Sequence, residues 1–182
     1  STETLIEYGR IEQQKEEVVE RLQLIRETES TTRDGKHIIL SANVDLPDDL
    51  ADIKASGAEG IGLYRTEFLY LNRDTCPDEE EQYGHYLRAA EESLPHSVII
   101  RTLDIGGDKS STSLLFEEEA NPFLGCRAIR FCLENLDVFK TQLRAILRAS
   151  TVGNIRIMYP MISGLQELRR ANAVLEECKN EL

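Results

Sequence analysis

The sequence alternates four short apolar runs with four segments of helical character. The runs span residues 37–43, 60–64, 98–102 and 155–158. Short apolar runs bounded by turn residues are typical of buried strands, and their alternation with helices predicts a parallel sheet with right-handed crossovers. Two α/β architectures fit this pattern: an open, doubly wound sheet, or part of a (β/α)8 TIM barrel.

Chain length limits how much of a barrel is present. The 182 residues are enough for one domain with a sizeable core, whereas a complete (β/α)8 barrel usually needs about 250. We therefore expect about the first four βα units, over residues 33–182. Such a half-barrel exposes two sheet edges, so we also expect it to self-associate or to have loose terminal elements.

The first two predicted helices have clear ends. Asp45 and Pro47 begin the first helix, and Gly57 closes it. The second opens near Pro77 and carries three acids at residues 78–80. These acids suit the positive end of the helix dipole, so we interpret them as a solvated first turn rather than as a metal site.

The last two helices are predicted in the same way. A helical segment runs from Arg127 to about Ala149, with a possible break near Asn135 and a stop at Gly153. The final helix is predicted to start at Ser163, where a Ser-x-x-Gln pattern forms a capping box, and to run to the end of the chain.

An amphipathic helix is predicted ahead of the first strand, within a linker segment of residues 1–32. Its apolar positions are spaced seven, four and three residues apart: Ile11, Val18, Leu22 and Ile25. The helix fits a connector to an upstream domain, a dimer contact, or an element packed on its own domain.

Composition excludes several classes of protein. The formal net charge of −12 disfavours nucleic acid or an anionic membrane as a partner. We expect no membrane insertion and no export, because no apolar run approaches about 18 residues and the N-terminus lacks a signal-peptide pattern. The four cysteines form no C-x-x-C pair, which favours reduced thiols in a cytoplasmic protein: Cys76, Cys126, Cys132 and Cys178.

Three arginines stand at positions that favour an anion site. Arg65 follows the second apolar run, and Arg101 holds the same position in the third. Ligand sites of parallel α/β proteins lie at the carboxyl ends of strands. Arg127 stands where a loop becomes a helix, and helix N-termini favour anions. We expect the three to bind phosphate and carboxylate groups; the alternative is rim salt bridges to Glu67 or Asp104.

The surrounding loops supply candidate supporting residues. In the loop of residues 103–126, Gly106 and Gly107 allow the backbone to approach an anion closely. Lys109 fits a solvated loop residue better than a phosphate contact, but it is kept as a candidate. The full supporting set is Glu67, Asp104, Gly106, Gly107, Lys109 and Asn121.

Three more arginines have simpler interpretations. Arg130 is expected to face solvent or to pair with Glu134, and Arg144 and Arg148 to lie on a solvated helix face.

Several segments together closely resemble the enzyme I family of the bacterial phosphoenolpyruvate-dependent sugar phosphotransferase system. They occur in the family's order and spacing, over residues 37–182: LYRTEF followed by N-R-D, VIIRTLDIGGDK, NPFLGCRAIR, QLRAILRAS and IRIMYPMI. The leading helix suits the family's linker. Pyruvate phosphate dikinase and phosphoenolpyruvate synthase share the barrel, but the RTLDIGGDK segment is more similar to enzyme I.

The resemblance implies a barrel that binds phosphoenolpyruvate and magnesium in a cytoplasmic, homodimeric phosphoenolpyruvate-protein phosphotransferase. The phosphoryl group is expected to pass to a histidine on a separate domain and then to a small phosphocarrier protein. Arg65 and Arg101 match the family's substrate-binding arginines, and Arg127 matches an arginine that holds the phosphoryl group.

The resemblance also implies that other functional residues are missing. The family's magnesium ligands, acid cysteine and acceptor histidine match no residue of this chain, so we expect no catalytic residue, no metal site and no turnover. His37, His85 and His96 are interpreted as structural or surface residues. Cys126 replaces a frequent tryptophan, and residues 110–115 diverge from the family. A non-catalytic module that binds phosphoenolpyruvate or a similar anion remains the alternative function.

Overall fold

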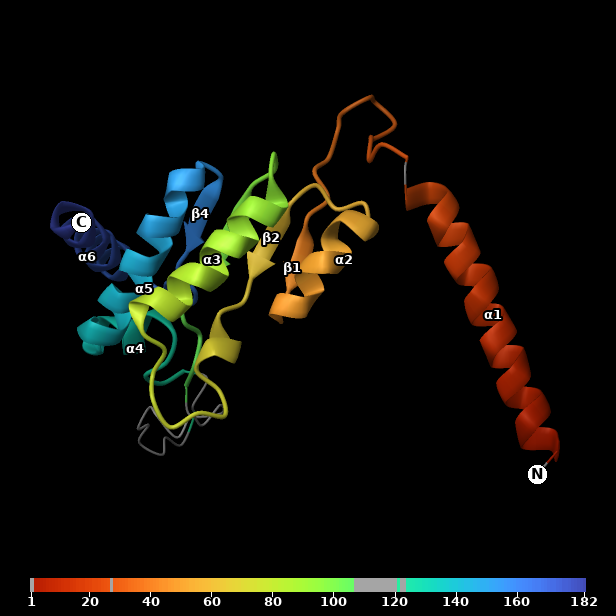
Figure 1. Ribbon diagram of the computed structural model, residues 1–182, viewed down its shortest axis with the longest axis horizontal. Helices are drawn as coiled ribbons and strands as arrows, with labels where there is room; N and C mark the ends of the chain where they lie inside the picture. The colour runs from red at the N-terminus through yellow and green to blue at the C-terminus, as the bar shows by residue number, and fades with distance from the viewer. Residues whose placement is uncertain (1, 27, 107–120, 122–123) are drawn as a thin grey trace.

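The computed structural model describes residues 2–26, 28–106, 121 and 124–182, and these form a four-stranded sheet with helices (Figure 1). The helices are α1 (Thr2–Arg26), α2 (Leu50–Ala55), α3 (Glu79–Ser93), α4 (Ile129–Glu134), α5 (Leu136–Ala149) and α6 (Leu165–Glu181). Short 3-10 turns are η1 (Pro47–Asp49), η2 (Glu67–Leu69) and η3 (Ser150–Val152).

All four strands of the sheet are parallel, and their order in space follows their order in the chain. They are β1 (Ala42–Val44), β2 (Ile61–Tyr64), β3 (Val98–Arg101) and β4 (Ile155–Met158). Pairing places Tyr64 beside Ile100 and Arg101 beside Met158. The predicted parallel α/β arrangement is confirmed, and the carboxyl ends of the four strands meet at one edge.

The first strand differs from the prediction. The apolar run of residues 37–43 becomes a strand only at Ala42, and Ile38, Ile39 and Leu40 are exposed. The backbone explains this: the Ile38 amide donates to the Ser30 carbonyl (2.7 Å), and an isolated antiparallel bridge joins Thr31 to His37. The beginning of the run is therefore held in a local hairpin rather than in the sheet.

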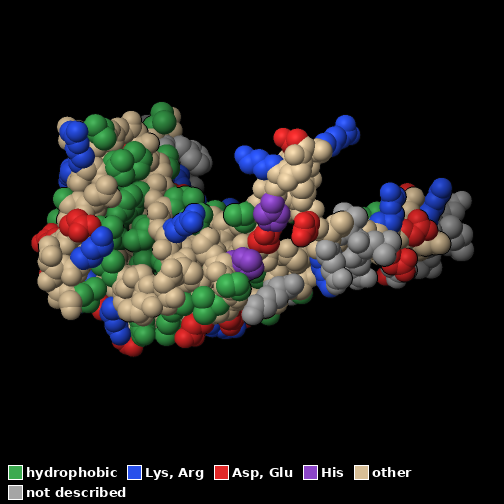
Figure 2. Space-filling model, turned by 90° about the horizontal axis from the view of Figure 1, so that it is seen from above, with side chains coloured by type: hydrophobic (Ala, Val, Ile, Leu, Met, Phe, Trp, Pro, Cys, Tyr) green, Lys and Arg blue, Asp and Glu red, His purple; other side chains and the backbone are tan. Residues whose placement is uncertain are grey.

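Helices α3 and α5 pack against each other, and α6 packs against α4 and α5 (Figure 1). Between these helices and the sheet lies the hydrophobic core. Its largest fully buried side chains include Tyr64, Tyr86, Ile100, Phe139 and Ile146. Hydrophobic side chains also gather on the surface of this broad part of the molecule (Figure 2).

Most predicted helix ends are confirmed. The Asp78 carboxylate caps α3 by accepting from the Glu81 amide (2.8 Å), and the break at Asn135 separates α4 from α5. The cap of α6 was predicted at the wrong residue. Gly164 is the N-cap, and Glu167 accepts from the Ser163 and Gly164 amides at 2.6 and 3.3 Å. Glu167 therefore closes the box in place of Gln166.

The acidic first turn of α3 and the basic face of α5 are not simply solvated, as the sequence had suggested. Glu79 accepts from both Arg144 (2.8 Å) and Arg148 (2.9 Å), which holds its pKa below the ordinary value. Arg148 also lies over the Tyr83 ring and pairs with Glu80. These contacts fasten α3 to α5.

Helix α1 projects away from the sheet (Figure 1). Its apolar residues Ile11, Val18 and Leu22 are all exposed. The Arg26 guanidinium at its C-terminal end donates to the Ala55 carbonyl of α2 (3.0 Å). In this structure the helix therefore does not bury these three positions against the sheet.

Two glycines give a test of the backbone. Gly60 precedes β2 with φ +112°, and a Cβ there would lie 2.6 Å from the Ser97 carbonyl oxygen, which accepts from the Ile61 amide. Gly60→Ala is expected to destabilise the fold by about 1–3 kcal/mol, because a side chain meets both a forbidden φ and a backbone clash. Chemical denaturation measures the change.

Gly84→Ala is the matched control. Gly84 lies inside α3, and no atom lies within 4 Å of the position that a Cβ would take there. Alanine is therefore expected to stabilise the fold by about 0.5–1 kcal/mol. A Gly60→Ala variant with a free energy of unfolding as high as that of Gly84→Ala would contradict the backbone described for Gly60.

Candidate functional site: an arginine cluster at the strand ends

The candidate site lies where β2 and β3 end. Arg65 directly follows β2, and its amide donates to the Val44 carbonyl of β1 (2.9 Å). Arg101 is the last residue of β3, and the Thr102 amide donates to the Met158 carbonyl of β4 (2.9 Å). Each arginine is thus fixed by backbone bonds to a neighbouring strand, and both emerge at the carboxyl edge of the sheet.

Arg101 is held between two carboxylates. Its Nη2 donates to Glu67 Oε1 (2.8 Å), and its Nη1 lies 3.3 Å from Asp104 Oδ2. The Arg101 side chain is 15% exposed and the Glu67 side chain 6%. Charges this far from water are stable only when they are paired, so the two acids fix the position of the guanidinium.

Arg127 reaches the same acid from the other side. Its Nη2 donates to Asp104 Oδ1 (3.1 Å), and its side chain is 7% exposed. Asp104 therefore bridges Arg101 and Arg127 and brings the start of α4 to the end of β3. The sequence placed the two arginines on separate segments, and this acid is what joins them.

The backbone around Arg127 is closely fitted. A Cβ on Gly106 would lie 2.4 Å from Cβ of Arg127, so only glycine allows this approach. Ala128, the next residue, has φ +51° and ψ −127°, and its amide donates to the Ile105 carbonyl (3.1 Å). Alanine rarely adopts this conformation, and strain of this kind concentrates at functional sites.

Arg65 is the most accessible of the three. Its side chain is 40% exposed, and its Nη1 donates to Asp45 Oδ2 (3.0 Å). The sequence had offered Glu67 or Asp104 as its alternative partner, but both of these acids contact the other arginines. Asp45 was missed because it was interpreted only as the entry to a helix.

Two donors in the cluster are unused. Among the described residues, neither Nε of Arg65 nor Nε of Arg101 has a hydrogen-bond partner, although both atoms are buried. A buried donor without an acceptor costs about 1–3 kcal/mol. A bound anion that supplies acceptor oxygens would satisfy both groups, since each guanidinium presents its donors as a planar fork.

Three of the supporting candidates from the loop of residues 103–126 are not seen to join the cluster in the described residues. Gly107 and Lys109 lie outside the described residues. Asn121 is exposed, and its carbonyl accepts from the Leu124 amide (3.1 Å).

Arg130 neither faces solvent freely nor pairs with Glu134, as had been expected. Its Nη1 donates to the Leu124 and Gly125 carbonyls at 2.7 and 2.6 Å. Glu134 instead accepts from the Cys126 thiol (3.0 Å). Arg130 therefore holds the backbone of the loop that leads into α4.

The contacts of His37 and His85 and the state of the cysteines fit structural roles. His37 lies 2.8 Å from Glu59, and His85 stacks edge-on against Phe68, where burial lowers its pKa. None of the four cysteines forms a disulfide, and burial raises the pKa of Cys132 to about 12, which keeps its thiol neutral.

Neither a membrane helix nor a metal cluster is found in the described ranges. No helix there has the length and apolar character to cross a bilayer. No three side chains among His, Cys, Asp and Glu come together as possible ligands of one metal ion in the same ranges.

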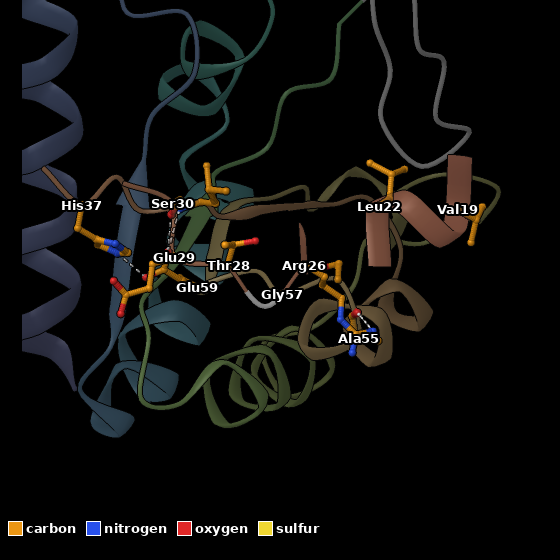
Figure 3. Close-up of a pocket in the computed structure, with 12 residues that line it drawn as sticks. Val19, Leu22, Arg26, Thr28, Glu29, Ser30, His37, Ala55, Gly57 and Glu59 are labelled. Carbon is orange, nitrogen blue, oxygen red and sulfur yellow. Dashed lines mark hydrogen bonds and ion pairs between the residues drawn. The ribbon is translucent and has the colours of Figure 1, made fainter. Parts of the chain in front are cut away.

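A pocket of about 800 Å³ lies away from the arginines, beside the amino ends of β1 and β2 (Figure 3). Helix α1 contributes Val19, Leu22 and Arg26, and the bonded pair of His37 and Glu59 also lines the pocket. Ligand sites of parallel α/β proteins lie at the carboxyl ends of strands, so the arginine cluster is the better candidate.

Comparison with known proteins identifies the family of the chain. Residues 19–182 match the sequence profile of the family described as PEP-utilising enzyme, PEP-binding domain, where PEP is phosphoenolpyruvate. Named relatives include two phosphoenolpyruvate-protein phosphotransferases. That of Staphylococcus carnosus (strain TM300) is 50% identical over 97% of this chain, and that of Bacillus subtilis (strain 168) is 51% identical over 84%.

The chain spans about a third of the length of these relatives: 31% of the first and 27% of the second. The family match covers most of the chain, including every strand and all three arginines of the cluster. The chain therefore belongs to the family of PEP-utilising enzymes, through their PEP-binding domain.

Proposed function

We propose that this chain supplies the phosphoenolpyruvate-binding arginines of a phosphoenolpyruvate-protein phosphotransferase, enzyme I of the sugar phosphotransferase system. The observation that carries the proposal is the arginine cluster, with two buried Nε donors that lack partners among the described residues. The family match and the names of the relatives support phosphoenolpyruvate as the anion.

The three arginines take separate roles in this proposal. Arg65 and Arg101, on adjacent strands, bind phosphoenolpyruvate, and Arg127 neutralises the phosphoryl group as it leaves. In-line phosphoryl transfer needs cations that neutralise the charge of the phosphate oxygens and fix their geometry. Glu67 and Asp104 hold two of the guanidiniums in place before the ligand arrives.

The charge balance favours an additional cation. Asp45, Glu67 and Asp104 match the three arginines in number, so the cluster is neutral as a group. Phosphoenolpyruvate carries both a carboxylate and a phosphate. Magnesium would supply the missing positive charge and polarise the phosphate. Glu67 and Asp104 already accept from guanidiniums, so we propose that its ligands lie outside this chain.

The remaining parts of the proposal follow from the fold and the resemblance. Strand order without reversal suits the first half of a (β/α)8 barrel, residues 33–182, better than a doubly wound sheet. Residues 1–32 then form a linker. We propose that the parent enzyme is a cytoplasmic homodimer that passes the phosphoryl group to a histidine on another domain and then to a phosphocarrier protein.

Arg65 gives the cleanest test of ligand binding. Arg65→Gln is expected to weaken phosphoenolpyruvate binding about 10- to 100-fold, since a hydrogen bond to a charged group contributes about 1.5–3 kcal/mol. Its ion pair with Asp45 is largely exposed, so stability should fall by at most about 1 kcal/mol. Isothermal titration calorimetry and thermal denaturation measure the two effects.

Arg88→Gln is the control for Arg65→Gln. Arg88 forms a similarly exposed pair with Glu92 within α3 and is not part of the arginine cluster. Its variant should bind phosphoenolpyruvate like the unmodified chain. Equal affinities of all three proteins would refute the assignment of Arg65 to the substrate.

A second prediction concerns turnover. Incubation of the chain with phosphoenolpyruvate, magnesium and a phosphocarrier protein should yield no phosphohistidine, because His37, His85 and His96 do not match the family's acceptor. A full-length phosphoenolpyruvate-protein phosphotransferase serves as the positive control. Acid-labile phosphate on the chain or on the carrier, above a reaction without the chain, would overturn this prediction.

A further inference from the structure

Gln142 of α5 is a fully buried polar residue beneath the arginine cluster. It opens the QLRAILRAS segment, for which the proposed chemistry gives no role. A buried amide is costly unless its donors and acceptor are all bonded. The hydrogen bonds of Gln142 therefore explain why this buried position holds a polar residue.

On one side, the amide joins the two strand ends that carry the site. Gln142 Oε1 accepts from the Leu103 amide (2.9 Å), two residues after Arg101. Gln142 Nε2 donates to Thr66 Oγ1 (3.1 Å), the residue after Arg65. The Thr66 hydroxyl in turn donates to the Arg101 carbonyl (3.0 Å). The chain leaving β2 and the chain leaving β3 are thus tied through one side chain.

On the other side, the amide contacts α3. Gln142 Nε2 also donates to the Tyr86 hydroxyl (3.1 Å), which donates to Gln82 Oε1 (3.0 Å). Gln82 closes the path by donating from Nε2 to the Pro77 carbonyl (3.2 Å). Because each hydroxyl both accepts and donates, the path has one consistent direction and the orientation of the Gln142 amide is determined.

We propose that Gln142 is a positioning residue for the arginine site: it fixes the spacing between Arg65 and Arg101 through Thr66 and Leu103. The residue is fully buried, and its side-chain amide bonds to Leu103, Thr66 and Tyr86, so it acts on the site through these neighbours. The positioning role of Gln142 rests on the proposed binding of phosphoenolpyruvate by these arginines. Small displacements of binding groups are enough to weaken a site strongly.

Two near-isosteric substitutions separate positioning from general stability. Thr66→Val and Tyr86→Phe each remove one acceptor of the same Gln142 NH2 group, but only Thr66 lies on the side of the site. Both variants should lose a similar few degrees of melting temperature. Gln142→Met, which keeps the length of the side chain, removes the contacts on both sides.

The three variants should differ in their affinity for phosphoenolpyruvate. Thr66→Val and Gln142→Met are expected to weaken binding at least about tenfold, whereas Tyr86→Phe should remain within about twofold of the unmodified chain. A loss of affinity that follows melting temperature across all three variants would show that Gln142 is structural only, and so would unchanged affinity in Thr66→Val.

Nitrogen-15 NMR of the arginine Nε–H groups provides a readout without ligand. Thr66→Val should shift the Arg65 and Arg101 resonances in the free protein, and Tyr86→Phe should leave them in place. If the unmodified chain does not bind phosphoenolpyruvate, the proposed function fails, but these resonances still decide the positioning role. Unshifted arginine resonances in Thr66→Val would overturn it.

Discussion

The pairing of Asp104 with two arginines is the interaction on which the site depends. Arg101 and Arg127 are 15% and 7% exposed, and each contacts one oxygen of the same carboxylate. Removing one member of a buried ion pair typically costs about 3–5 kcal/mol, because the other charge is left without compensation. The start of α4 is therefore tied to the end of β3 by charge, in addition to packing.

In the proposed function, this pairing serves binding as well as stability. The carboxylates of Glu67 and Asp104 orient the guanidinium of Arg101, whose buried Nε has no partner among the described residues and could bond to a ligand. The buried amide of Gln142 holds the backbone beneath the same residues. Ordering a site before the ligand arrives lowers the entropy cost of binding. The carboxylates thus act as supports for the arginines and not as competitors for the ligand.

The sequence was informative about this fold where local patterns determine structure. Three of the four strands, the break at Asn135 and the start of α3 near Pro77 follow from apolar runs and local helix-end signals. The first strand was placed too early because Ile38 bonds to Ser30 in a hairpin. The Arg101–Asp104 pair matches the salt-bridge alternative offered by the sequence. The contacts of Asp45 and Gln142, and the bridge from Asp104 to Arg127, could not be predicted, since each joins segments that only the folded chain brings together.

A crystal structure of the chain with phosphoenolpyruvate and magnesium tests the central claim most directly. We predict ligand density at the carboxyl ends of β2 and β3, with ligand oxygens within hydrogen-bond distance of Arg65 Nε and Arg101 Nε and with the Asp104 bridge intact. Arg127 should contact the phosphate. Density confined to the pocket lined by Arg26 and Glu59, or a ligand bound without the three arginines, would contradict the account.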